Sequence, residues 1–261
     1  RSMRAQGCAI ITITHKLNEV LAISDRVTIL RKGKYIDTVN TAETDEKNLT
    51  ERMVGRPVSL EIERPEPVDP KTILKIIDLT VRKPDGSLAL NDANFEVRTG
   101  EILGVAGIAG SGQRELCECI AGLCPAETGA ILYRKENLIG KTPREIIRLG
   151  VQLGFVPEDR LGMGLVASMG MVGNMMLKTY DAPKGPFVDP APARRRAEEL
   201  VQRLEIATPS VDTPVRLMSG GNVQKVLLGR EIESDPQVLI TAYPVRGLDI
   251  HSSYTVYDLL N

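Results

Sequence analysis

Short apolar runs alternate with amphipathic stretches along most of the chain, and this alternation is typical of an α/β fold. Runs of β-branched and aliphatic residues predict buried strands over residues 9–13, 102–106 and 238–242. Apolar positions that recur every three or four residues predict helices over residues 113–123 and 223–232. Strands that alternate with helices indicate a mostly parallel sheet covered on both faces.

Two other kinds of segment interrupt this alternation. Residues 26–39 and 73–97 hold apolar runs separated by turn signals, which predicts antiparallel strand pairs. Residues 162–189 are rich in Gly, Met and Pro, and a charged amphipathic helix is expected over residues 192–204. We therefore expect a helical subdomain over about residues 162–216, inserted into the α/β fold.

The composition changes between the N-terminal region and the rest of the chain. Pro57, Pro65, Pro67 and Pro70 lie there among charged residues. Prolines at this density oppose both helix and sheet, so residues 57–71 are expected to be an extended linker. It would separate a short segment, residues 1–56, from a domain over residues 72–261.

Charge and composition restrict the possible functions. Lys and Arg number 33 against 34 Asp and Glu, giving a net charge of −1, which argues against nucleic acid or an anionic membrane as the main partner. The apolar runs are far shorter than the ~20 residues needed to span a bilayer, and no N-terminal signal peptide is visible. The four cysteines have no metal-ligand spacing, so no metal site is expected from them.

One candidate anion site begins the predicted helix over residues 223–232. Ser219 is a good N-cap, and Gly220 and Gly221 leave backbone N–H groups uncovered. Free amides and the positive end of the helix dipole favour an anion at such a place. An ordinary capped helix without a ligand is the alternative interpretation.

A second candidate is the glycine loop between the predicted strand over residues 102–106 and the following helix. It has the G-x-x-x-x-G frame of a P-loop in the required context. Lys and Ser or Thr should follow the frame, but Gln113 and Arg114 stand there. The backbone can still hold phosphate, whereas the lysine charge and the hydroxyl that ligates Mg²⁺ are missing. The candidate nucleotide-binding residues are Gly107, Gly110, Ser111, Gly112, Gln113 and Arg114. A glycine-rich turn without a ligand is again the alternative.

These two motifs, followed by Pro244-Val245-Arg246-Gly247-Leu248-Asp249, resemble in their order the nucleotide-binding domain of ABC transporters. The resemblance implies a P-loop NTPase-like α/β fold, with a mixed or parallel sheet, an antiparallel β subdomain and a helical insertion. It implies that Ser219, Gly220 and Gly221 close over ATP held by an opposite domain. Glu158 stands in the place of the family's Q-loop glutamine, and Asp249 matches its D-loop aspartate.

The strand over residues 238–242 departs from the family pattern. The family has an Asp that holds Mg²⁺ and a Glu that acts as base, and Ala242 and Tyr243 occupy those places. Losing a general base typically costs ~10²–10⁴ in rate. Together with the altered glycine loop, this predicts a domain that binds nucleotide without cleaving it, and a weak or absent Mg²⁺ site.

Residues 11–20 and 24–34 resemble the family's switch-histidine region and the hairpin after it, which makes His15 a candidate catalytic residue. Alone, a histidine at a strand end is more often structural. By this resemblance, residues 1–56 are the C-terminal fragment of a first nucleotide-binding domain. Residues 72–261 are most of a second one, truncated at its C-terminus.

This arrangement resembles the fused two-domain ATPases of ribose/galactose-type importers. The glycine loop at Gly107 and the strand end at Ala242-Tyr243 most resemble the nucleoside branch of that group. It implies an ATP-binding component, working with ATP and Mg²⁺, for uptake of nucleosides or simple sugars. The implied partners are transmembrane permease subunits, the missing half of the chain and, indirectly, an extracytoplasmic binding lipoprotein, at the cytoplasmic face of the plasma membrane. A non-transport ABC-type regulatory or structural module is the alternative.

Overall fold

The computed structural model divides the chain into two compact units, Arg1–Glu63 with Leu248–Asn261, and Arg64–Gly247. We refer to them as the small unit and the large unit. The structure describes residues 2–14, 16–31, 33–55, 57, 62, 64–108, 110–149, 151, 153–178 and 188–261.

The small unit consists of a β-hairpin and short helices. Strands β1 and β2 pair antiparallel, as the alternating pattern predicts. The buried side chains of Leu17, Ile29 and Leu49 form its core, and Ile250 packs against them. The elements are α1 (Ser2–Ala5), α2 (Leu17–Ile23), β1 (Arg26–Arg31), β2 (Lys34–Asn40), the 3₁₀ turn η1 (Thr41–Glu43), α3 (Glu46–Val54) and α9 (Ile250–Leu260).

The strand predicted over residues 9–13 is wrong. These residues form no strand, and the side chains of Ile11 and Ile13 are 93% and 97% exposed. A β-strand needs a neighbour to accept and donate its backbone hydrogen bonds, and apolar composition alone does not provide one. The segment therefore completes no sheet in this structure.

An antiparallel sheet lies at one end of the large unit. Its strands follow the order β4-β3-β5-β6, with all neighbours antiparallel. Buried side chains of β3 and β5, including Ile76, Leu79 and Ile131, pack with Leu116 of α4 and Ile146 of α5 in one core. The elements are β3 (Thr72–Arg82), β4 (Leu88–Arg98), α4 (Gln113–Ile120), β5 (Thr128–Tyr133), β6 (Glu136–Asn137) and α5 (Pro143–Arg148).

A parallel strand pair forms the centre of the large unit. β7 (Leu153–Val156) pairs with β8 (Val238–Thr241), and α8 (Gly220–Ile232) packs against β7. The prediction of a buried strand over residues 102–106 is wrong, because the structure assigns no strand there and Ile102 is 63% exposed. Residues 102–106 have the apolar pattern of a central strand, but no described strand pairs with them, so their side chains are exposed to solvent.

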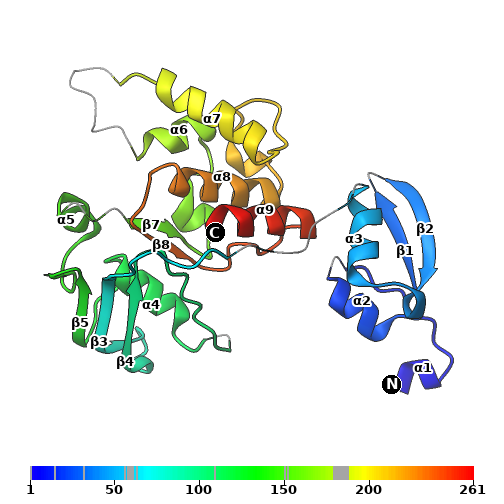
Figure 1. The fold of residues 1–261 in the computed structure, drawn as a ribbon, viewed down its shortest axis with the longest axis horizontal. Coiled ribbons are helices and arrows are strands. Elements are labelled where there is room, and N and C mark those ends of the chain that lie inside the picture. Colours follow the sequence, from blue (N-terminus) through cyan, green and yellow to red (C-terminus); the bar gives the residue numbers. More distant parts are fainter. Residues whose placement is uncertain are drawn as a thin grey trace. The chain divides into compact units, whose positions relative to one another are not determined.

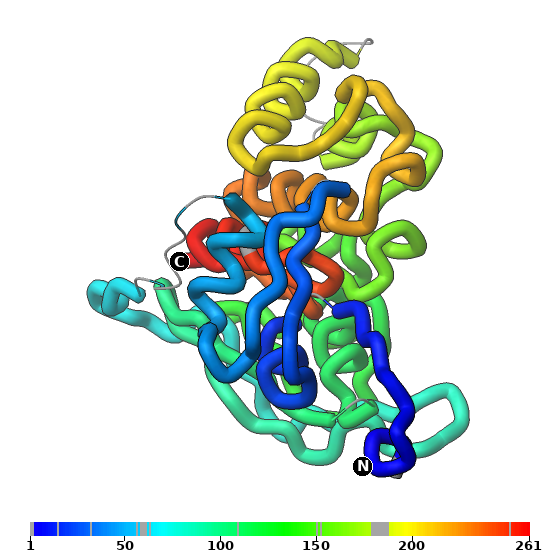
Figure 2. Tube along the Cα trace, turned by 90° about the vertical axis from the view of Figure 1, so that its right-hand side faces the viewer, coloured from blue at the N-terminus to red at the C-terminus, as the bar shows by residue number. Residues whose placement is uncertain are grey.

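The helical part lies at the end of the large unit opposite β3 and β4, with α8 and the β7–β8 pair between them (Figures 1 and 2). Helices α6 and α7 pack against each other. Asn174 of α6 is buried and exchanges hydrogen bonds with the backbone of Val166, which ties the helix to the preceding loop. This part contains the π-helical turn η2 (Arg160–Gly164), α6 (Met171–Met176), α7 (Ala191–Arg203) and the 3₁₀ turn η3 (Val215–Leu217).

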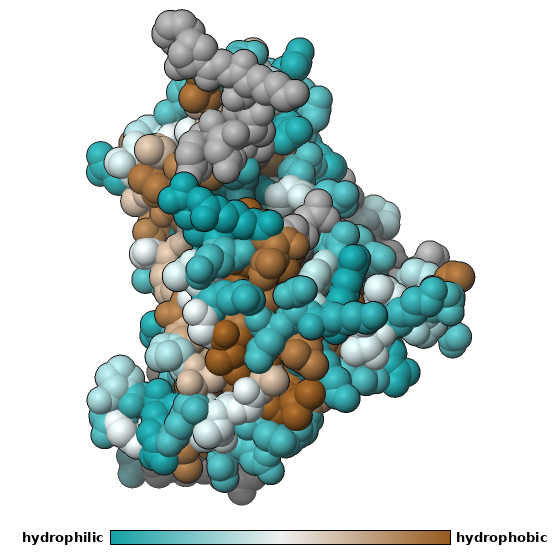
Figure 3. Space-filling model, turned by 90° about the vertical axis from the view of Figure 1, so that its left-hand side faces the viewer, coloured by the Kyte–Doolittle hydropathy of each residue, from teal (hydrophilic) through white to brown (hydrophobic). Residues whose placement is uncertain are grey.

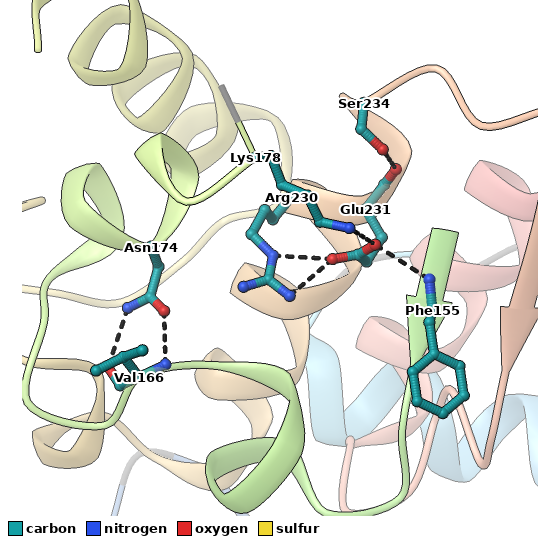
Figure 4. Close-up of polar contacts among 7 residues, drawn as sticks. All are labelled: Phe155, Val166, Asn174, Lys178, Arg230, Glu231 and Ser234. Atoms are coloured by element: carbon teal, nitrogen blue, oxygen red, sulfur yellow. Dashed lines mark hydrogen bonds and ion pairs between the residues drawn. The ribbon is translucent and has the colours of Figure 1, made fainter. Parts of the chain in front are cut away.

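A buried carboxylate joins the helical part to the central strands (Figure 4). Glu231 of α8 is fully buried. Its Oε2 accepts hydrogen bonds from Lys178 Nζ at 2.7 Å and from the backbone N–H of Phe155 at 3.1 Å. Its Oε1 accepts from Arg230 Nε at 2.9 Å and has an ion-pair contact with Arg230 Nη2 at 2.7 Å. One side chain thus connects α8, strand β7 and the residues that follow α6.

The surface is mixed in character. Figure 3 shows hydrophobic atoms between hydrophilic ones on the face that it draws. Exposed large apolar side chains of the large unit include Leu103, Val105 and Ile108, next to the glycine loop. Among the helices that the structure describes, none combines the length and the apolar character needed to cross a membrane.

Candidate functional site

The glycine loop has the backbone conformation that its glycines allow. Gly110 and Gly112 have φ values of 86° and 91°, which L side chains rarely adopt. A Cβ at Gly112 would lie 2.2 Å from the carbonyl oxygen of Ala89, so this position also requires the absence of a side chain. Space around Gly110 is open, and both Gly110 and Ser111 are exposed. The loop therefore presents accessible backbone at Gly110 and Ser111, although the N–H of Ser111 already donates to the carbonyl oxygen of Ile108 at 3.2 Å.

The two side chains after the loop do not restore the missing lysine. Gln113 donates from Nε2 to the carbonyl oxygen of Ile108 at 3.3 Å, and its amide lies against Gly107. Arg114 pairs along the helix with Glu118, Nε to Oε1 at 2.7 Å. Hydrogen bonding to Glu118, then the charges of nearby carboxylates, raise the pKa of Arg114. The positive charge of Arg114 is thus directed to a carboxylate of its own helix.

The serine–glycine helix start forms as the sequence predicts. Ser219 has extended backbone, and its Oγ accepts from Asn222 N at 3.4 Å and from Asn222 Nδ2 at 2.9 Å. Ser219 and Gly220 are exposed and Gly221 is half-buried, so the first turn of the 13-residue helix α8 faces solvent. This geometry suits an anion that approaches from outside the domain.

Two arginines that the sequence analysis did not single out connect three predicted motifs. Arg160 Nη1 donates to the carbonyl oxygen of Gly220 at 2.8 Å, and Nη2 donates to that of Arg246. Arg246 in turn forms an ion pair with Glu158. Burial, and then the charge of Arg246, lower the pKa of Arg160. The start of α8, the end of β7 and the loop after β8 are thereby held together through side chains.

The end of strand β8 carries no carboxylate at the two positions where the family has them. The backbone N–H of Ala242 donates to the carbonyl oxygen of Val156 at 2.8 Å. Tyr243 has a φ of 52° and is 51% exposed, and its ring centroid lies 5.9 Å from the guanidinium carbon of Arg246. A phenol stacked near a cation is not placed to act as the carboxylate base that the family uses.

Asp249 and His15 are the last two candidates from the sequence. Asp249 is the N-cap of α9, and its carboxylate accepts from the backbone N–H of Ser252 at 2.9 Å. It belongs to the small unit by contacts. His15 lies outside the described residues, so its role stays a prediction.

The donor groups fit a nucleotide better than a metal ion. The loop offers open backbone at Gly110, whereas the side chains of Arg114 and Ala242 carry no oxygen that could ligate Mg²⁺. Among the described residues, no group of three or more His, Cys, Asp or Glu side chains is placed to hold a metal. The open backbone at Gly110 would thus suit a phosphate of a nucleotide.

A glycine loop before a helix, a parallel strand pair, an antiparallel sheet and a helical part together define a nucleotide-binding cassette of the P-loop class. The family model described as ABC transporter matches residues 90–244. The chain therefore belongs to the ABC transporter ATP-binding family, which confirms the resemblance inferred from the motifs.

Curated relatives carry names of import proteins. The chain is 39% identical over 253 residues to "Nucleoside import ATP-binding protein NupA" of Lactococcus lactis subsp. cremoris, covering 96% of this chain and 50% of that protein. It is 36% identical to "Putative ribose/galactose/methyl galactoside import ATP-binding protein 2" of Burkholderia cenocepacia, covering 100% and 50%. It is 37% identical to "Ribose import ATP-binding protein RbsA 1" of Rubrobacter xylanophilus, covering 100% and 51%. The chain spans about half the length of these relatives.

Solved structures confirm the predicted fold class. The dimeric ATP-binding cassette MJ0796, in a post-hydrolysis state bound to ADP and Pi, superposes with a TM-score of 0.63 at 21% identity, covering 72% of this chain and 81% of that one. The cassette cbiO1 from Clostridium perfringens gives 0.56 at 23% identity, covering 72% of each chain. At these identities the likeness establishes the α/β cassette fold alone.

Proposed function

We propose that the chain is part of the ATP-binding component of an importer for nucleosides or simple sugars, and that residues 72–261 bind ATP without hydrolysing it. In this proposal, residues 1–56 are the end of a first nucleotide-binding domain and residues 72–261 are most of a second. The relatives that support this are named as import ATP-binding proteins, and the chain matches half of each.

The observation that carries the proposal is a loss of catalytic groups at two separate places while the anion-binding backbone is retained. Gln113 and Arg114 replace the lysine and hydroxyl of the glycine loop, and Ala242 and Tyr243 replace the carboxylates after β8. Gly110 and the exposed start of α8 keep their backbone open. Binding of phosphate depends on that backbone, whereas cleavage depends on the missing side chains.

The exposed start of α8 would then serve ATP held by the opposite domain. Ser219, Gly220 and Gly221 would close over that ATP, and the first domain would supply the P-loop and the switch histidine His15. Transmembrane permease subunits would receive the conformational change, and an extracytoplasmic binding lipoprotein would deliver the solute to them. The chain would work at the cytoplasmic face of the plasma membrane.

The nucleoside branch is the narrower form of this proposal. The relative named for nucleoside import has 39% identity, against 36%, 37% and 38% for relatives named for ribose/galactose, ribose and xylose import. The glycine loop and the Ala242-Tyr243 pair resemble that branch in the sequence as well.

A pair of matched substitutions tests ATP binding at the glycine loop. Gly110 has open space and a left-handed backbone that Asp and Asn both tolerate. Gly110→Asp should abolish binding of a fluorescent ATP analogue, because its carboxylate repels phosphate, and Gly110→Asn should retain most of it. Equal loss in both variants, or no binding by the unmodified chain, would contradict the proposal.

Hydrolysis is tested on the same preparations. We expect no phosphate release from MgATP above that of a buffer blank. Measurable turnover that His15→Ala abolishes would show that the chain forms a hydrolytic site by itself, against the proposal.

A further inference from the structure

A lysine from a different element reaches the glycine loop. Lys83 Nζ lies 3.4 Å from the carbonyl oxygen of Gly110 and donates a hydrogen bond to it. Lys83 follows strand β3, 27 residues before Gly110 in the chain. Among the described side chains, Lys83 forms no ion pair, in contrast to Arg114, which pairs with Glu118. Hydrogen bonds from Ser87, and then the charge of Lys83, lower the pKa of Asp85 in the same turn, so a ligand at the loop would compete with this exposed carboxylate for the Lys83 charge.

The β3–β4 turn fixes the backbone from which Lys83 extends. Lys83 N donates to the carbonyl oxygen of Ser87 at 2.8 Å, and Gly86 N donates to that of Lys83 at 2.9 Å. Asp85 accepts from both the backbone N–H and the hydroxyl of Ser87, at 2.9 Å and 2.6 Å. Lys83 itself is half-buried. The hydrogen-bonded turn orders the backbone at Lys83, whereas ordering of the lysine side chain by a ligand still costs rotamer entropy.

Close packing holds this hairpin against the loop. The Cα of Gly112 lies so near the start of β4 that an added Cβ would be 2.2 Å from the carbonyl oxygen of Ala89 and 2.7 Å from Leu90 Cδ2. The hairpin and the glycine loop are thus in direct contact. The turn positions the backbone of Lys83, and its flexible side chain brings the ammonium group to the carbonyl oxygen of Gly110.

We propose that Lys83 supplies the positive charge that the glycine loop lacks, and binds the phosphates of the nucleotide together with the loop amides. This inference rests on the proposed function, since it assumes that the loop binds ATP. An ammonium group acts as a point charge, so it can neutralise phosphate oxygens from the side of the loop as well as from its centre. The contact with the Gly110 carbonyl keeps the ammonium at the rim until phosphate competes for it.

Lysine-to-glutamine substitution measures the contribution of this charge. Lys83→Gln should weaken binding of the full chain to MgATP about tenfold, the effect of roughly one charge-assisted hydrogen bond in a partly exposed site. The loss should be smaller for ADP and absent for adenosine, measured by displacement of a fluorescent ATP analogue. Lys83→Arg should retain most of the affinity. Lys75→Gln is the matched control, because Lys75 is an exposed lysine roughly 25 Å further along the same strand.

A second substitution moves the charge to the family's usual place. Gln113→Lys in the Lys83→Gln background should restore ATP affinity, since the Gln113 side chain already lies over the loop at Gly107. Added salt should weaken ATP binding less in Lys83→Gln than in the unmodified chain, because a charge contact has been removed.

The outcomes separate the two proposals. Unchanged ATP affinity in Lys83→Gln, or an equal loss for adenosine and ATP, would overturn the role of Lys83 while leaving ATP binding intact. No ATP binding by the unmodified chain would overturn the proposed function instead. Circular dichroism of each variant checks that it is folded.

Discussion

Glu231 offers the strongest test of how the large unit is held together. Glu231→Ala removes a carboxylate that is fully buried, accepts three hydrogen bonds and has a further ion-pair contact with Arg230 Nη2 (Figure 4). The guanidinium of Arg230, whose side chain is 9% exposed, then remains buried without its anion, whereas Lys178, at 34%, keeps access to water. The backbone N–H of Phe155 loses its acceptor.

The expected cost follows from the burial of these charges. Removing one partner of a buried ion pair destabilises a protein by about 3–5 kcal/mol, because the remaining charge is left uncompensated. That is a large part of the roughly 5–15 kcal/mol by which domains are stable. At a slope of about 2 kcal/mol per M of urea, the unfolding midpoint should fall by roughly 2 M. Glu231→Gln keeps the volume but not the charge, so its cost should be smaller.

Urea unfolding followed by circular dichroism is the assay, with Glu233→Ala as the matched control. Glu233 forms an ion pair with Arg203 at 2.6 Å, but both side chains reach solvent, and such pairs contribute roughly 0–1 kcal/mol. A midpoint for Glu231→Ala no lower than that for Glu233→Ala would refute the reasoning, and would mean that water already solvates the carboxylate.

Three further predictions follow from local contacts. Arg160→Met should speed amide hydrogen exchange in the first turn of α8 with little change in the urea midpoint, because two hydrogen bonds to carbonyl oxygens are lost at the surface. Unchanged exchange would show that Arg160 does not hold the start of α8. Hydrogen bonds from Thr142 lower the pKa of Glu145 below its ordinary 4.5, so its stabilisation of α5 is complete above that pH and is lost as the pH falls through the lowered value. Stability curves of Glu145→Gln should lack this loss. Burial raises the pKa of the Cys119 thiol to about 11, so maleimide at neutral pH should label exposed Cys8 first, as peptide mass spectrometry can determine.

Hydrophobic periodicity and capping residues in the sequence predicted the helices well. The helix predicted over residues 192–204 forms as α7 over Ala191–Arg203, and Ser219 caps α8 as its type and position indicate. These features depend on interactions within one or two turns, which the sequence displays directly. The strands predicted over residues 9–13 and 102–106 are absent from the structure. A strand needs a neighbour for its backbone hydrogen bonds, and the apolar pattern of one segment does not show which segment will lie beside it.

The sequence predicted the motifs of the candidate site, but not the side-chain contacts that join them. The glycine loop and the start of α8 could be identified because their backbone requirements select glycine and serine. The contacts of Arg160 join residues 60 and 86 positions apart, and that of Lys83 spans 27. Such contacts depend on which strand ends and turns the fold brings together. The residues next to Arg160 and Lys83 in the sequence do not indicate which distant carbonyl oxygens these two side chains contact.

The most direct test of the central claim is the identity of the nucleotide that the chain holds. The chain is incubated with radiolabelled MgATP, separated rapidly from free nucleotide, and the bound fraction is resolved by chromatography. The account predicts intact ATP at about one molecule per chain, with Gly110→Asp holding none. Bound ADP with release of labelled phosphate, beyond that of the Gly110→Asp control, would contradict it.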